Sequence, residues 1–93
     1  MKVLASMEVS KGYEHWKKSF LAHEEARSNA GIATIFFARE AANESKVHVC
    51  MEVESMEVLG AFMSDPENAK VIEEAGGVGD SAVIIPLVDY PLI

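Results

Sequence analysis

The chain has 93 residues, of which 49% are hydrophobic and 25% are charged, and this composition is typical of an ordinary globular protein. We therefore expect one domain spanning residues 1–93. Eight Lys and Arg against fifteen Asp and Glu give a net charge of −7, which argues against nucleic-acid partners and against docking on anionic membranes. The first ten residues have the pattern of neither a signal peptide nor a membrane span, so the sequence predicts a cytoplasmic protein.

The first half of the chain predicts a strand, a long helix and a hairpin of two strands. Apolar residues alternate over 3–9, whereas over 13–29 they recur at helical spacing with no Pro or Gly. Residues 32–40 and 46–54 predict two strands joined by a turn at 41–45. Strict alternation in the first of these strands places Ile32, Thr34, Phe36 and Ala38 on one face and Ala33, Ile35 and Phe37 on the other.

The second half predicts a broken helix and a last strand. Ser55 is expected to cap a helix over 56–63, and Asp65 before Pro66 is expected to start a second segment that runs to about residue 75. The last strand is expected at 82–88, at a sheet edge or with a bulge, because Pro86 has no N–H to donate. The apolar tail at 89–93 needs a surface to lie on. The helix residues expected to face inward are Met56, Leu59, Phe62, Met63, Ala69, Ile72 and Ala75.

The order β-α-β-β-α-β predicts an α+β, ferredoxin-like fold. Its four-stranded antiparallel sheet would have the strand order 4-1-3-2, with both helices on one face. The strands at 32–40 and 82–88 are apolar on both faces, although the helices can cover only one. We therefore expect a second copy of the chain to cover the other face, giving a homodimer through the sheet faces.

Several local features accompany this order: an aromatic first helix, a glycine after it, a capped and interrupted second helix, and a helix end rich in small residues. They are Tyr13–Phe20, Gly31, Ser55, Ser64-Asp65-Pro66 and Glu74-Ala75-Gly76. Over nearly the whole chain this pattern resembles the dimeric α/β-barrel superfamily, whose members include antibiotic-biosynthesis-monooxygenase-like proteins. The resemblance implies a homodimer whose two sheets form a barrel, and a ligand cavity in each subunit between sheet and helices.

The same resemblance implies a range of activities. The superfamily contains monooxygenases that use neither metal nor flavin, haem-degrading enzymes, isomerase-like enzymes and members without known activity. The predicted second helix holds no histidine, so no haem ligand carries over from that element. The third strand ends Val53-Glu54-Ser55, where many members carry a Trp. We accordingly expect no cofactor.

One stripe of the first helix carries the best candidate for a site. This stripe consists of four residues at helical spacing: Trp16, Phe20, His23 and Arg27. The two aromatic residues come first, and the two residues that can donate hydrogen bonds, as cations or in neutral form, come last. We expect an elongated apolar pocket, suited to a fatty-acid-like or polyketide-like molecule, with His23 and Arg27 at its polar end. The aromatic and methionine residues expected to line it are Trp16, Phe20, Met51, Phe62 and Met63. The simpler alternative is ordinary core packing, with an arginine whose head reaches solvent.

His23 and His48 are the candidate catalytic residues, because imidazole exchanges protons near neutral pH. His48, Cys50 and Glu52 share one face of the strand at 46–54, but neighbours on one face are about 6.5–7 Å apart and converge poorly on a tetrahedral ion. We therefore expect no metal site and interpret Cys50 as an inert thiol. A binding protein, a cofactor-free monooxygenase- or isomerase-like enzyme, and a structural dimer without a ligand all remain open.

Overall fold

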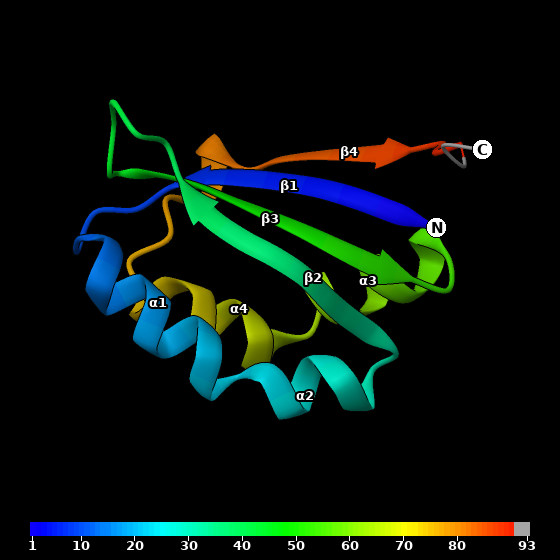
Figure 1. Ribbon diagram of the computed structural model, residues 1–93. Coiled ribbons are helices and arrows are strands. Elements are labelled where there is room, and N and C mark those ends of the chain that lie inside the picture. Colours follow the sequence, from blue (N-terminus) through cyan, green and yellow to red (C-terminus); the bar gives the residue numbers. More distant parts are fainter. Residues whose placement is uncertain (91–93) are drawn as a thin grey trace.

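The computed structural model describes residues 1–90, so the last three residues of the predicted tail lie outside the described part. One antiparallel sheet carries all the helices on one of its faces (Figure 1). The order of strands in the sheet is β2-β3-β1-β4, which confirms the predicted α+β, ferredoxin-like arrangement. The elements are β1 (Lys2–Glu8), α1 (Tyr13–Ala22), α2 (Glu24–Asn29), β2 (Ile32–Arg39), β3 (Lys46–Val53), α3 (Met56–Met63), α4 (Pro66–Glu74), the 3₁₀ turn η1 (Gly79–Ser81) and β4 (Val83–Leu87).

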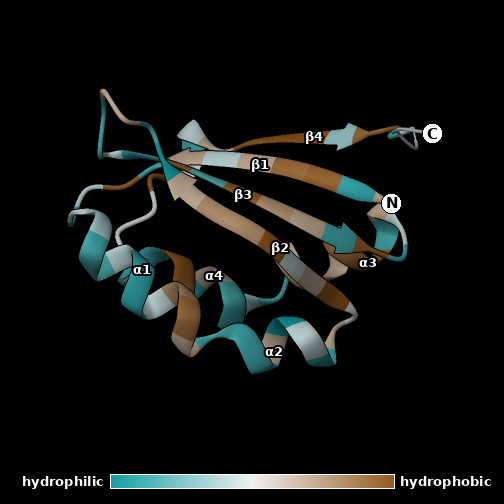
Figure 2. Ribbon diagram, viewed as in Figure 1, coloured by the Kyte–Doolittle hydropathy of each residue, from teal (hydrophilic) through white to brown (hydrophobic). Residues whose placement is uncertain are grey.

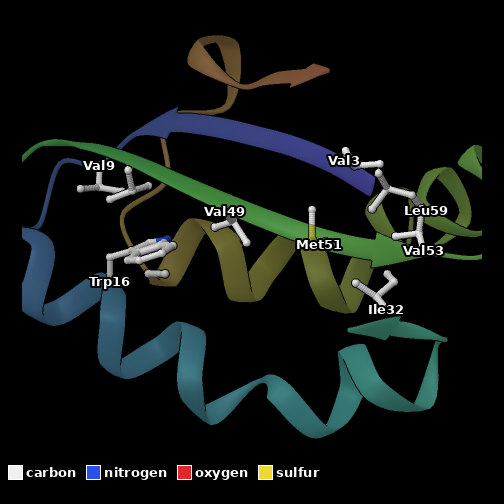
Figure 3. Close-up of a cluster of buried hydrophobic side chains, with 10 residues drawn as sticks. Val3, Val9, Trp16, Ile32, Val49, Met51, Val53 and Leu59 are labelled. Carbon is white, nitrogen blue, oxygen red and sulfur yellow. The ribbon is translucent and has the colours of Figure 1, made fainter. Parts of the chain in front are cut away.

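The core lies between the sheet and the helices. One face of β3 packs into the core, since Val47, Val49, Met51 and Val53 are all buried. Across the sheet Val3 lies opposite Met51, and Ala5 lies opposite Val49. Figure 3 shows this cluster, in which Leu59 and Ile32 close the end of the sheet where α3 begins.

The strict alternation expected in β2 is wrong beyond Thr34. Thr34 lies opposite Met51 and Phe36 lies opposite Cys50, so Ile35 is an extra residue in a β-bulge. The bulge places Ile35 and Phe36 on exposed positions, and it turns Phe37 toward the helices, where it packs against the core. Phe36 therefore does not share a face with Ile32.

The single helix expected over 13–29 is divided at His23. The backbone N–H of His23 donates to the carbonyl of Phe20 at 3.2 Å, which is the tighter i→i−3 bond of a 3₁₀ turn. Helical bonding resumes where the N–H of Arg27 donates to the carbonyl of His23 at 3.3 Å. His23 and Arg27 therefore face the same cavity as Trp16 and Phe20. Among residues 1–90, no helix has the length and apolarity needed to cross a membrane.

Both predicted caps of the second helical region are present. The Ser55 hydroxyl accepts a hydrogen bond from the N–H of Val58 at 3.2 Å, and Oδ1 of Asp65 accepts one from the N–H of Glu67 at 2.9 Å. Two inward positions are wrong: Met56 is exposed, and Ala69 is exposed while its neighbour Asn68 is buried. Because α4 begins at Pro66, residues 68, 72 and 75 share the face that meets the sheet.

The sheet face away from the helices carries an apolar row across all four strands. Phe36 lies opposite Cys50, Cys50 opposite Leu4, and Leu4 opposite Ile85. Figure 2 shows the hydrophobic colouring of β4 and of the adjoining part of β1. Phe36 and Ile85 are 50% and 47% exposed in the single chain. As predicted, Pro86 lies on an edge strand.

Candidate functional site: an apolar cavity beneath the sheet

A cavity of about 120 Å³ lies between the helix-covered face of the sheet and the helices. This is several times the roughly 10–15 Å³ that one water molecule needs. Its sheet side includes Ala5, Val49 and Met51, while α3 and α4 contribute further apolar side chains. All seven ligand-binding residues expected from the sequence line this one space: Trp16, Phe20, His23, Arg27, Met51, Phe62 and Met63.

An aromatic cluster forms one wall. The rings of Trp16 and Phe20 are stacked, with centroids 4.9 Å apart. Phe37, which the bulge in β2 turns inward, meets Trp16 edge-on at 6.0 Å and Phe20 at 5.4 Å. Aromatic pairs in these arrangements are stabilised beyond the effect of area burial alone. Trp16 and Phe20 of α1 line the cavity, and their contacts with Phe37 attach this wall to β2 and hold Trp16 in place.

Arg27 is a buried cation within this largely apolar environment. It is only 5% exposed, and its Cζ lies 3.6 Å from the centroid of the Phe20 ring. Burial lowers the pKa of the guanidinium, and the nearby charge of Glu24 partly opposes that shift. Within residues 1–90, Nε and Nη2 of Arg27 are buried and have no hydrogen-bond partner. Buried donors without partners are rare and costly, so Nε and Nη2 of Arg27 are the polar atoms of the cavity best suited to bind an acceptor.

His23 and Asn68 are hydrogen-bonded to each other in the cavity lining. Nε2 of His23 donates a hydrogen bond to Oδ1 of Asn68 at 3.1 Å, and Nδ2 of Asn68 contacts Sδ of Met63 at 3.8 Å. When the imidazole is neutral and protonated at Nε2, its basic lone pair is on Nδ1. In this tautomer, Nδ1 is the ring nitrogen that can accept a proton, four residues before Arg27 in the chain.

Asn68 is the site residue that sequence reasoning missed. It is 4% exposed and lines the cavity beside Val71, Ile72 and Ala75 of the same helix. The sequence does contain a signal for it, because the Asp65 cap fixes where α4 begins. In that helix Asn68 lies three, four and seven positions before apolar residues and therefore shares their face.

The second histidine candidate lies elsewhere. His48 belongs to the sheet face away from the helices, where its Nε2 lies 2.8 Å from Oε2 of Glu40. Cys50 is buried on that same face, and Glu52 contacts the N-terminal amino group at 3.1 Å. Over residues 1–90, no group of three or more His, Cys, Asp or Glu side chains is placed to hold a metal ion. The structure therefore separates His48 from the cavity and from the other candidate residues.

Comparisons with known proteins bear on the fold. No family model matches the sequence, and no curated protein matches it. A structure from Deinococcus radiodurans, provisionally named an antibiotic biosynthesis monooxygenase, is 9% identical with a TM-score of 0.66, covering 100% of this chain and 98% of its own. Provisionally named counterparts from Nitrosomonas europaea and Caulobacter crescentus are 13% and 19% identical, with TM-scores of 0.65 and 0.64.

The matches to the structures from Nitrosomonas europaea and Caulobacter crescentus, in that order, also extend over most of each chain. The first covers 96% of this chain and 100% of the other, and the second covers 95% and 89%. At such identities the likeness shows the fold alone. The chain thus has the ferredoxin-like fold of antibiotic-biosynthesis-monooxygenase-like proteins, as its sequence pattern predicts.

Proposed function

We propose that this protein binds an elongated apolar small molecule, fatty-acid-like or polyketide-like, between its sheet and its helices. The observation that carries the proposal is the cavity of about 120 Å³ lined by apolar side chains from both layers. Each CH₂ group buried there would contribute about 0.8 kcal/mol to binding. The names of the structures that share the fold refer to antibiotic biosynthesis, which is compatible with an organic ligand of this kind.

The edge strand offers a way in. Ala82 and Ile84 line the cavity, and both are exposed to solvent. Since β4 has a neighbouring strand on one side only, its outer side is a natural entrance. A ligand entering there would contact Met51 and the aromatic wall inside the cavity.

Ligand retention and titration test this function. Native mass spectrometry of the purified protein, followed by solvent extraction, should reveal a retained apolar molecule. Titration with butanoate, hexanoate, octanoate and decanoate should change Trp16 fluorescence, with affinity rising until the cavity is full. The Ala5→Leu variant should weaken binding of the longer chains because it fills the cavity. Ala61→Leu, at an exposed position of α3, is the matched control. No response to any chain would overturn the proposal and favour a structural dimer without a ligand.

A cofactor-free monooxygenase- or isomerase-like enzyme is the second candidate function. The specific observation in its favour is the hydrogen bond from His23 to Asn68, which leaves Nδ1 of His23 as the basic nitrogen. Such a base, beside the cationic Arg27, suits removal of a proton next to a carbonyl. Deuterium exchange at that carbon of a bound ketone, lost in His23→Gln while binding is retained, would support this activity. Binding without exchange would exclude it.

We further propose a homodimer in which a second copy of the chain covers the open sheet face. The apolar row from Phe36 to Ile85 supports this, because soluble monomers rarely leave such a continuous apolar patch in water. A two-fold axis near the middle of the row would bring its two copies together. The cytoplasmic location expected from the sequence belongs to the same proposal.

A further inference from the structure

Resting on the proposed function, we infer that the ligand carries an anionic oxygen headgroup, in the first place a carboxylate, and that Arg27 binds it through Nε and Nη2. These are the two guanidinium nitrogens that are both buried and without a hydrogen-bond partner within residues 1–90. The inference names the class of molecule that the cavity selects: an organic anion with an apolar body.

The identity of the two atoms carries the argument. In a guanidinium group, the N–H bonds of Nε and Nη2 point the same way from one edge of the plane. That edge forms the fork that matches the two oxygens of a carboxylate, with two parallel hydrogen bonds. In Arg27 both donors of this one edge are unpartnered. A single N–H without a partner would suit any carbonyl oxygen. Two parallel N–H donors without partners suit a planar anion with two oxygens, such as a carboxylate.

The surroundings of Arg27 hold this edge in place. The ring of Phe20 lies against one face of the guanidinium, 3.6 Å from Cζ to the ring centroid, and restricts its plane. Phe20 is in turn fixed by its stacking on Trp16. A cation–π contact does not neutralise the charge, and Arg stays protonated under ordinary conditions. The cation is therefore preorganised for an anion.

Arg27 has no ion-pair partner among residues 1–90. The nearby Glu24 is exposed on the same helix. The simpler reading, an arginine whose head reaches solvent, is contradicted by its 5% exposure. A buried, unpaired charge is strongly unfavourable, and a ligand carboxylate would relieve that cost. Neutral or cationic ligands would leave it in place.

Calorimetric titration with matched ligands tests the inference. We compare octanoate with octan-1-ol and methyl octanoate, and we add 2-naphthoate to distinguish a linear acid from a flat fused-ring one. The wild-type protein should bind octanoate about tenfold to a hundredfold more tightly than octan-1-ol, the range expected for a charge-assisted hydrogen bond. In Arg27→Met this ratio should fall to about one. Arg39→Met, at an exposed arginine of β2, should keep the wild-type ratio.

A second measurement needs only the wild-type protein, in case Arg27→Met fails to fold. The carboxyl group of ¹³C-labelled octanoate should titrate at a lower pKa when bound than when free, because the guanidinium favours the charged form. An unchanged or raised pKa would overturn the inference. Equal binding of acid and alcohol would overturn it too, while leaving the apolar cavity as a binding site. Binding of none of the four compounds would overturn both the inference and the proposed function.

Discussion

Nε2 of His23 donates a hydrogen bond to Oδ1 of Asn68 over 3.1 Å, which joins the turn between α1 and α2 to the first part of α4. The two residues are 45 positions apart in the chain. Asn68 also contacts Met63 through its Nδ2, so three segments of the cavity wall meet at one amide. This contact orients His23 and couples the shape of the cavity to the packing of α1 and α2 against α4.

Asn68→Ala should lower the free energy of unfolding by about 1–2 kcal/mol, because it leaves the partly buried Nε2–H of His23 without an acceptor. Urea denaturation followed by circular dichroism would measure the change. Asn29→Ala, at an exposed position near the end of α2, should alter stability by less than about 0.5 kcal/mol. Equal effects of the two substitutions would show that the His23 contact contributes nothing.

Two glycines should respond in opposite directions to substitution by alanine. Gly76 has a φ of +91°, and an added Cβ would lie 3.0 Å from the backbone N of Lys11, so Gly76→Ala should destabilise the protein by about 1 kcal/mol or more. Gly60 lies inside α3 with nothing within 4 Å of an added Cβ, so Gly60→Ala should stabilise it by about 0.5–1 kcal/mol. Thermal unfolding of both variants provides the comparison. A loss of stability in Gly60→Ala would contradict the account of α3.

Ile85→Asp should convert the proposed dimer to a monomer or cause aggregation, because it places a charge in the apolar row of the open sheet face. Multi-angle light scattering at micromolar concentration would report the mass. Ile85 is 47% exposed in the single chain, and Leu21 on α1 is 44% exposed, so Leu21→Asp is a matched control that should remain dimeric. Ile35→Asp should behave like Ile85→Asp. A monomeric wild-type protein would refute the dimer directly.

The pairing of Lys2 with Asp89 should be visible as a shifted carboxyl titration. Nζ of Lys2 donates to Oδ2 of Asp89 at 2.6 Å, which lowers the pKa of Asp89 and raises that of Lys2. The pair is therefore complete above the unfolded carboxyl pKa and is lost as the pH falls through the depressed pKa of Asp89. At the alkaline end it is lost as the pH rises through the raised pKa of Lys2.

Carboxyl ¹³C NMR should place the midpoint of Asp89 below the usual aspartate value, and Lys2→Met should return it there. An Asp89 midpoint that Lys2→Met leaves unchanged would assign the shift to another cause. Because both groups are exposed, we expect little change in overall stability.

The positions of Trp16, Phe20, His23 and Arg27 on one face could be predicted from spacing alone. The 3₁₀ turn at His23 does not disturb that prediction, because helical bonding resumes at Arg27. The faces of β3 were equally predictable, since its apolar and polar residues alternate cleanly. Patterns of this kind depend only on the geometry of one element.

The features that sequence reasoning missed depend on contacts between elements. The bulge at Ile35 has no sequence signal, because β2 carries apolar residues on both of its faces and a shift of register leaves that pattern unchanged. Asn68 was missed because a single polar residue in a helix is normally expected to be exposed. Its burial depends on the hydrogen bond with His23, which the sequence alone does not reveal. The edge of Arg27 that has no partner within residues 1–90 is likewise invisible in the sequence, since it depends on where the polar groups of the folded chain lie.

The bulge in β2 also determines how this strand tolerates changes in length. Ile35 has no partner of its own, while Thr34 and Phe36 lie opposite consecutive residues of β3. A chain from which Ile35 is deleted could therefore keep the partners of Thr34, Phe36 and Phe37, with a straighter strand as the main change. The same deletion anywhere in β3 would move the following side chains to the opposite face. Variation in length within this sheet should thus be accommodated at the bulge and excluded from the strand beside it.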